Sequence, residues 1–249
     1  MATDPMKQFE IETIVEGPKF GFIDTTFTNS SLWMIIATLG VILLFATGTG
    51  RKLIPGRMQS IAELSYEFIA DMIKDTTGPE AMKFFPFVFT IFFFILFANL
   101  LGMNPWAFTT TSHLAVTAAL SIFVVGMVLV LGIVKNGFKF FKIFAPSGLP
   151  WPMYLLIVPI EIISFISRPV ALSVRLFANM MAGHVILKVF AIFIAWLIGM
   201  GGVYWAAAIV PIIGTTAIVA LEFLVAALQA FVFAILTCVY LNDVYHVDH

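Results

Sequence analysis

A run of basic side chains interrupts one of the most apolar stretches of the chain. Residues 168–188, RPVALSVRLFANMMAGHVILK, contain Arg168, Arg175, His184 and Lys188. Arginine keeps its proton inside proteins, so Arg175, deep in the apolar stretch, needs a charged partner or water. Ionisable groups in such surroundings usually mark an ion path or a charge pair. We therefore expect Arg175 to be functional, and Arg168 to be an anchor at the edge of the apolar region.

Further polar residues share helical faces with this arginine or with one another. Asn179 follows Arg175 by four positions, so its amide lies on the same face and could orient the guanidinium. In the next apolar block, Glu222 and Gln229 are seven positions apart and also share a face. In each block, these polar side chains are therefore expected on one face of the helix.

Helical arithmetic brings two titratable groups to one level. If the two blocks run antiparallel with Arg175 level with Gln229, then Glu222 is level with Ala182, about 3 Å along the axis from His184. Arg175 and His184 point opposite ways, however, whereas Glu222 and Gln229 point the same way. A contact between His184 and Glu222 would therefore need a bend, a bulge or bridging water.

Composition shows what must position these groups. The chain has 249 residues, of which 61% are hydrophobic and 11% charged, and its mean hydropathy is +1.05. Such a chain is too apolar for a soluble domain and indicates an integral membrane protein. The net charge of −1 gives no reason to expect nucleic acid. A lone cysteine, Cys238, supports neither a disulfide nor a metal site, and no cofactor is expected.

The first part of the chain predicts three spans and a surface helix. A water-exposed arm (1–25) precedes a first span at 26–50. The segment 57–76 has amphipathic helical spacing and is expected on the membrane surface or against a partner. The segment 84–134 reads as two spans, broken by the connector NPWAFTTTSH at 104–113.

The blocks 152–199 and 202–241, separated by GMGG, are each about twice the length that a perpendicular helix needs. Each either folds back on itself or forms one long, tilted helix. Folding back would put Arg168, Arg175 and Lys188 outside, against the positive-inside bias, so we prefer two long helices in a hairpin. The prediction is an all-α integral membrane protein, a single membrane domain (1–249) with about five crossing helices.

Lysine and arginine set the expected orientation. The segments 51–83 and 135–142 are basic and the connector at 104–113 is not, so both basic loops face the cytoplasm. The arm (1–25) then lies outside, and the tail (242–249) lies in the cytoplasm.

Two stretches make the chain similar to a known family. RPVALSVRLFANMMAGHVI and ALEFLVAALQAFVFAILTCVYL closely resemble the signature helices of subunit a of F-type ATP synthases, and NLLGMNP with TSHLAVTAALS resembles its earlier spans. The order of histidine and acid resembles that of mitochondrial and alphaproteobacterial members, and the long N-terminal arm favours a bacterial one. Asn99 and Asn104 stand where some relatives place aspartates, so a channel role for the connector does not follow from the resemblance.

The resemblance implies the stationary proton-channel subunit of a rotary motor, with no enzymatic activity of its own. Arg175 matches the essential arginine between two half-channels, and Asn179, Gln229 and Glu161 fall on positions that the family uses. His184 and Glu222 match the histidine and acid of the periplasmic channel.

The partners that the resemblance implies are a ring of c subunits, b-type peripheral stalk subunits, lipid and protons, with no nucleic acid and no direct nucleotide binding. It also implies a multi-pass protein of the bacterial cell inner membrane, with a periplasmic N-terminus and a cytoplasmic C-terminus.

Other classes fit the sequence less well. An ion-coupled secondary transporter or another proton-conducting subunit is the main alternative, but no internal repeat is visible. A haem-binding subunit would need pairs of histidines facing across spans, and His184 stands alone within the spans. No G-x-x-x-x-G-K-[ST] phosphate loop is present, so nucleotide chemistry is not expected on this chain.

Overall fold

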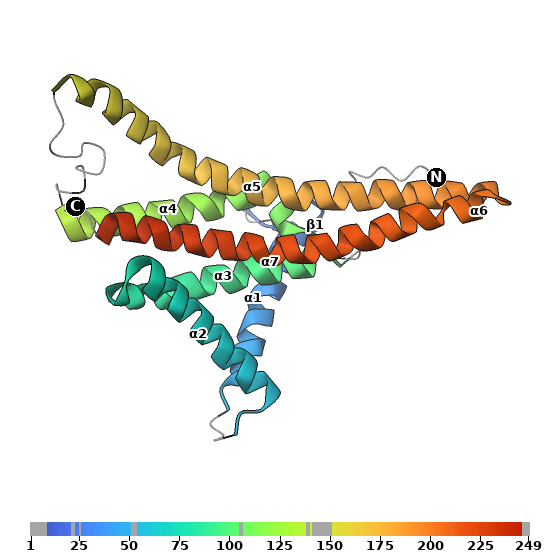
Figure 1. Cartoon of the computed structure of the whole chain (residues 1–249), viewed down its shortest axis with the longest axis horizontal. Coiled ribbons are helices and arrows are strands. Elements are labelled where there is room, and N and C mark those ends of the chain that lie inside the picture. The colour runs from blue at the N-terminus through green and yellow to red at the C-terminus, as the bar shows by residue number, and fades with distance from the viewer. Residues whose placement is uncertain are drawn as a thin grey trace. The chain divides into compact units, whose positions relative to one another are not determined.

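The computed structural model describes residues 9–20, 23–24, 26–50, 54–104, 107–137, 140 and 151–245. Expectations for the start of the arm, residues 51–53, half of the basic loop 135–142 and the end of the tail lie outside these residues. The long helices of the described part are α1 (Asn29–Gly48), α2 (Arg57–Thr77), α3 (Phe85–Gly102), α4 (Leu114–Asn136), α5 (Trp151–Met200) and α7 (Ile209–Tyr245), as Figure 1 shows.

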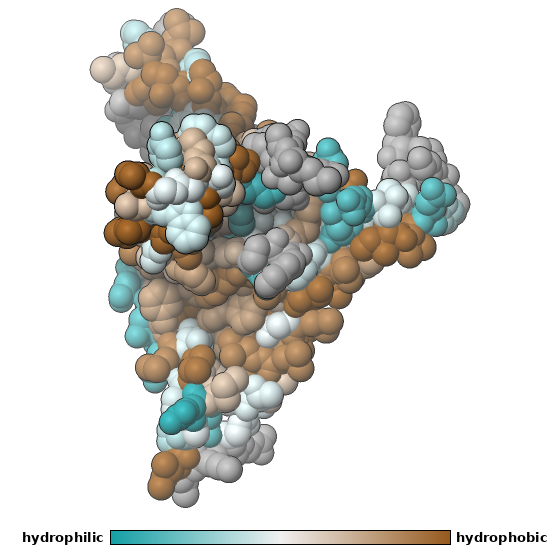
Figure 2. Space-filling model, turned by 90° about the vertical axis from the view of Figure 1, so that its right-hand side faces the viewer, coloured by the Kyte–Doolittle hydropathy of each residue, from teal (hydrophilic) through white to brown (hydrophobic). Residues whose placement is uncertain are grey.

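Five segments of this part are long and apolar enough to cross a membrane, and they contain α1, α3, α4, α5 and α7. Large apolar side chains on them face outward; Leu155 and Val210, for example, are 85% and 74% exposed. Figure 2 shows apolar side chains over much of the visible face. Such a surface suits lipid or other membrane subunits and not water. The prediction of an all-α integral membrane protein is confirmed.

The predicted surface helix is α2, which begins and ends within one residue of the expected bounds 57–76. Its second half buries Ile69, Met72 and Ile73, while Ile61 and Leu64 in its first half stay exposed. Gly78 follows with φ at 93°, a conformation that favours glycine, and leads into the 3-10 helix η2 (Pro79–Phe84).

Each of the last two apolar blocks forms one long helix. The helix α5 runs unbroken through Pro159 and Pro169. A turn with positive φ at Gly201 and Gly202 and the short helix α6 (Tyr204–Ala207) follow, and α7 then continues to Tyr245, beyond the predicted end at 241. These lengths agree with the preferred reading of two long helices.

The arm carries short strands that the sequence analysis did not predict. Strand β1 (Thr13–Val15) pairs antiparallel with β4 (Phe27–Thr28), and β2 (Lys19–Phe20) pairs with β3 (Ile23–Asp24). Asn29, the first residue of α1, ties the arm down: its backbone N–H donates to the carbonyl of Glu12 (3.1 Å) and its amide to that of Glu10 (3.2 Å).

The chain divides into two compact units, and α1, α3, α5 and α7 each contribute residues to both. Unit 1 contains residues 1–41, 94–113 and 176–229, and unit 2 contains residues 42–93, 114–175 and 230–249. Each unit is described by itself below.

Candidate functional site

An antiparallel helix pair in unit 1 sets the register of the candidate site. The second half of α5 and the first half of α7 run side by side (Figure 1), with Gly183 against Glu222 and Phe190 against Gly214. The sequence analysis placed Glu222 level with Ala182, one residue from the position observed. The assumed register of the two blocks is thus reproduced within this unit.

Gly183 allows the Glu222 side chain to lie directly on the backbone of α5. A Cβ at this position would collide with the Glu222 carboxylate and would lie 2.8 Å from its Cδ. The Glu222 side chain is half-buried, and it makes no hydrogen bond or ion pair to the described residues. A carboxylate among apolar helices is costly in its charged form. Contact with water or uptake of a proton lowers that cost.

His184, the residue after Gly183, turns toward the connector. Its Nε2 lies 3.1 Å from the hydroxyl of Thr109, and the ring of Phe9 approaches it edge-on at 6.4 Å between centroids. Among the described residues, His184 and Glu222 share no direct hydrogen bond, in keeping with their different directions on the two helices. Thr109 is a neighbour that the sequence analysis did not identify.

The end of α3 and the connector bury polar groups near this pair. Asn99 is 0% exposed, and its amide donates to the carbonyl of Ala226 (3.4 Å), one turn beyond Glu222. Its own carbonyl oxygen, and the Thr111 hydroxyl, have no hydrogen-bond partner in the described part of the chain. Buried polar atoms of this kind are usual sites for ordered water. Asn99, whose role the resemblance left open, therefore lines the same region as Glu222.

Burial lowers the pKa of His113, at the end of the connector, although a hydrogen bond with the Phe9 backbone acts in the opposite direction. The ring is consequently neutral at neutral pH. The connector thus carries no formal charge there.

Arg175 lies on an exposed face of α5. By helical spacing its neighbours on that face are Ala171, Ala178 and Ala182, which are exposed too. No described carboxylate forms an ion pair with Arg175. The guanidinium therefore projects from a strip of small side chains toward whatever covers this face.

Asn179 and Gln229, the two amides expected near Arg175, are half-buried residues of unit 1. Glu161 is half-buried on the first half of α5, in unit 2. It is fourteen residues before Arg175, which is about 21 Å along a helix. Within unit 1, the structure thus brings Glu222 and His184 onto adjoining surfaces.

Arg168 does not act as a solitary anchor. In unit 2 its Nη1 donates to Oδ2 of Asp243 (2.8 Å), and its guanidinium lies 5.0 Å from the ring of Tyr240 and 5.7 Å from that of Phe165. The sequence analysis ended the last helix before Asp243 and so missed this partner.

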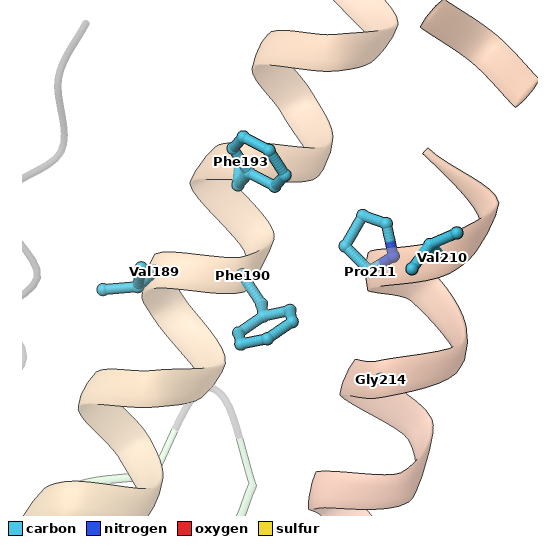
Figure 3. Close-up of a pocket in the computed structure, with 6 residues that line it drawn as sticks. All are labelled: Val189, Phe190, Phe193, Val210, Pro211 and Gly214. Atoms are coloured by element: carbon cyan, nitrogen blue, oxygen red, sulfur yellow. The ribbon is translucent and has the colours of Figure 1, made fainter. Parts of the chain in front are cut away.

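The helix pair also forms an apolar pocket at the end that is nearer the Gly201–Gly202 turn. A pocket of about 350 Å³ lies between α5 and α7 and is lined by Phe190 and Phe193 on one side and by Pro211 and Gly214 on the other (Figure 3). Its lining is apolar throughout. In the part of the chain that the structure describes, no three His, Cys, Asp or Glu side chains are grouped to hold a metal ion.

Comparison with known proteins agrees with the geometry. Residues 31–242 match the family described as ATP synthase A chain. The chain is 55% identical over 249 residues to ATP synthase subunit a of Hyphomonas neptunium, covering 100% of this chain and 98% of the relative. It is also 55% identical to the same subunit of Allorhizobium ampelinum (99% and 98% covered) and of Nitrobacter hamburgensis (99% and 99%). A membrane chain with this helix pair and this match along its length belongs to the ATP synthase subunit a family.

Proposed function

We propose that this chain is the stationary proton-channel subunit of an F-type ATP synthase in the bacterial inner membrane. Its partners are a rotating ring of c subunits with membrane-embedded carboxylates and b-type stalk subunits. The chain holds two half-channels for protons and a fixed arginine between them. It performs no nucleotide chemistry itself.

The observation that carries this proposal is that Arg175 has no ion-pair partner among the described residues. A permanent positive charge in an apolar helix needs a counter-charge, and the described part of the chain supplies none. The alanines around it let another helix approach closely, since small side chains permit tight packing in membranes. A carboxylate from a neighbouring subunit completes the pair.

In this proposal the other polar groups form the proton path. Protons enter from the outside past Glu222 and His184 and neutralise a ring carboxylate, which can then move through lipid because the charged form is too costly there. After a circuit the proton leaves on the cytoplasmic side past Glu161. The ionised carboxylate is then attracted by Arg175, whose charge also repels protons from a direct path.

The division into units supports the orientation of this scheme. The segments expected outside, which are the arm, the connector and the GMGG turn, all belong to unit 1, as do Glu222 and His184. The expected cytoplasmic segments 51–83 and 135–142 and Glu161 belong to unit 2. Residues proposed for each half-channel therefore occur in the same unit as the loops expected on that side of the membrane.

The arginine is tested by Arg175→Lys, which keeps a charge but loses the planar fork and allows deprotonation. We expect ATP-driven proton pumping in inverted membrane vesicles to be lost, while immunoblots show normal amounts of assembled complex. Arg168→Lys is the matched control, because a lysine there keeps the charge opposite Asp243, and it should pump almost normally. Normal pumping by an assembled Arg175→Lys complex would remove this residue from the mechanism.

The outer path is tested by Glu222→Gln, which deletes a titratable group with little change of shape. We expect proton flux to fall far more than the amount of assembled complex. Because water can replace one link of a proton chain, the loss should be smaller than for Arg175→Lys. Equal losses of flux and of assembled complex would indicate that Glu222 is only structural.

A further inference from the structure

The end of α3, the connector and His184 meet at the Thr109 hydroxyl. This hydroxyl donates to the carbonyl of Gly102 (3.0 Å), the last residue of α3, and lies 3.1 Å from Nε2 of His184. The last carbonyls of a helix have no partner within the helix. Thr109 therefore satisfies one of them while contacting the histidine.

The backbone around Thr109 holds the hydroxyl in place. The carbonyl of Thr109 accepts from the backbone N–H of Ser112 (3.2 Å) and from its hydroxyl (2.6 Å). Gly102 has no Cβ, and one built there would lie 2.9 Å from Cγ2 of Thr109. Thr109 is 5% exposed, so water does not compete freely for its hydroxyl.

Proton counting then settles which partner donates to which. A hydroxyl has one proton and a carbonyl oxygen can only accept, so the Thr109 proton is committed to Gly102. If it were turned to His184 instead, two oxygens would face each other with no proton between them in a buried site, which is unfavourable. The bond between Thr109 and His184 must therefore use the proton on Nε2.

We propose that Thr109 is a positioning residue that holds the His184 ring with Nε2–H as a fixed donor, so that Nδ1 is the atom that accepts and releases the relayed proton. The inference rests on the proposed function, because the relay role of His184 belongs to it. The donor assignment itself depends only on the geometry around Thr109.

Two variants separate the hydroxyl from the shape of the side chain. Thr109→Val keeps the volume and removes the hydroxyl, whereas Thr109→Ser keeps the hydroxyl. We expect Thr109→Val to slow proton pumping by roughly fivefold, the factor that corresponds to one lost hydrogen bond of about 1 kcal/mol, with normal assembly. Thr109→Ser should pump like the wild type.

Nitrogen NMR of the intact membrane complex, labelled with 15N-histidine, reads the proton directly. A difference spectrum against His184→Gln cancels the other histidines. We expect neutral His184 to show a protonated, hydrogen-bonded Nε2 and a bare Nδ1. The Nε2–H signal should shift in Thr109→Val and remain in Thr109→Ser.

A bare Nε2, or a His184 spectrum that does not change in Thr109→Val, would overturn the donor assignment. The expected spectra with unchanged pumping in Thr109→Val would instead overturn the relay role of His184 and with it that part of the proposed function. Expected spectra together with slowed pumping in the valine variant alone would establish Thr109 as a positioning residue.

Discussion

The contact between Gly183 and Glu222 can be tested by adding a single methyl group. In Gly183→Ala the new Cβ would lie 2.8 Å from Cδ of Glu222, whereas ordinary contacts begin at 3.4 Å. The carboxyl carbon must therefore move by at least 0.6 Å, the difference between 3.4 and 2.8 Å, and the oxygen on the clashing side must move further. The atoms in the way are the far end of a flexible side chain, so the carboxylate can turn aside at a cost of about 0.5–1.5 kcal/mol, and each 1.4 kcal/mol is tenfold in a rate.

If Glu222 is a link of the proton path, pumping by Gly183→Ala should fall by roughly 2- to 13-fold, the rate factor for this energy. The assay is ATP-driven proton pumping in inverted vesicles, normalised to the amount of subunit in the assembled complex. Gly199→Ala is the matched control on the same helix, because a Cβ at Gly199 meets nothing within 4 Å. It should pump like the wild type.

A second substitution decides whether the effect passes through the carboxylate. Glu222→Asp withdraws the carboxylate by one methylene, about 1.5 Å, and so makes room for the alanine. In a double-mutant cycle, Gly183→Ala should therefore cost much less in the Glu222→Asp background than alone. Additive losses would refute the reasoning, since they would mean that the methyl group acts elsewhere.

Two other predictions concern the ends of the long helices. Arg168→Leu and Asp243→Asn should each lower the free energy of unfolding of the complex in detergent by about 1–2 kcal/mol. This value is discounted for screening by solvent, because the two side chains are 21% and 35% exposed. The reversed pair, Arg168→Asp with Asp243→Arg, should recover part of the lost stability. Single cysteines at Gly201 and Asp248, in a Cys238→Ser background, should react with an impermeant reagent from opposite sides of the membrane. Reaction from the same side would contradict two long helices.

Helix lengths and register could be predicted because they follow from simple periodic features. Uncharged stretches bounded by proline, glycine and basic residues gave α1, α3 and α4 close to their observed bounds. The hairpin register needed one assumption, Arg175 level with Gln229, and helical rise then placed Glu222 beside the residue before Gly183.

Side-chain partners were harder to predict, because they depend on directions that helical spacing does not fix. The Asp243 partner of Arg168 lies on the last turns of α7, just after the polar Asn242, at which the predicted apolar block had ended. Thr109 reaches His184 from a connector with no periodic pattern at all. The strands of the arm are two or three residues long, too short for alternation to be visible.

The last half of α7 is tied at three heights by side chains from other elements of unit 2. The Thr77 hydroxyl donates to the carbonyl of Cys238 (2.9 Å), the Asn136 amide to that of Val244 (2.7 Å), and Arg168 holds Asp243. Sliding the helix along its axis by one residue, about 1.5 Å, would break all three bonds at once, and twisting it would break them as well. An interface of apolar contacts alone, without directional hydrogen bonds, would resist sliding and twisting much less. If the chain is the stationary subunit proposed above, this end of α7 is suited to resist the force of a turning rotor, because it is stiff to shear as well as to separation.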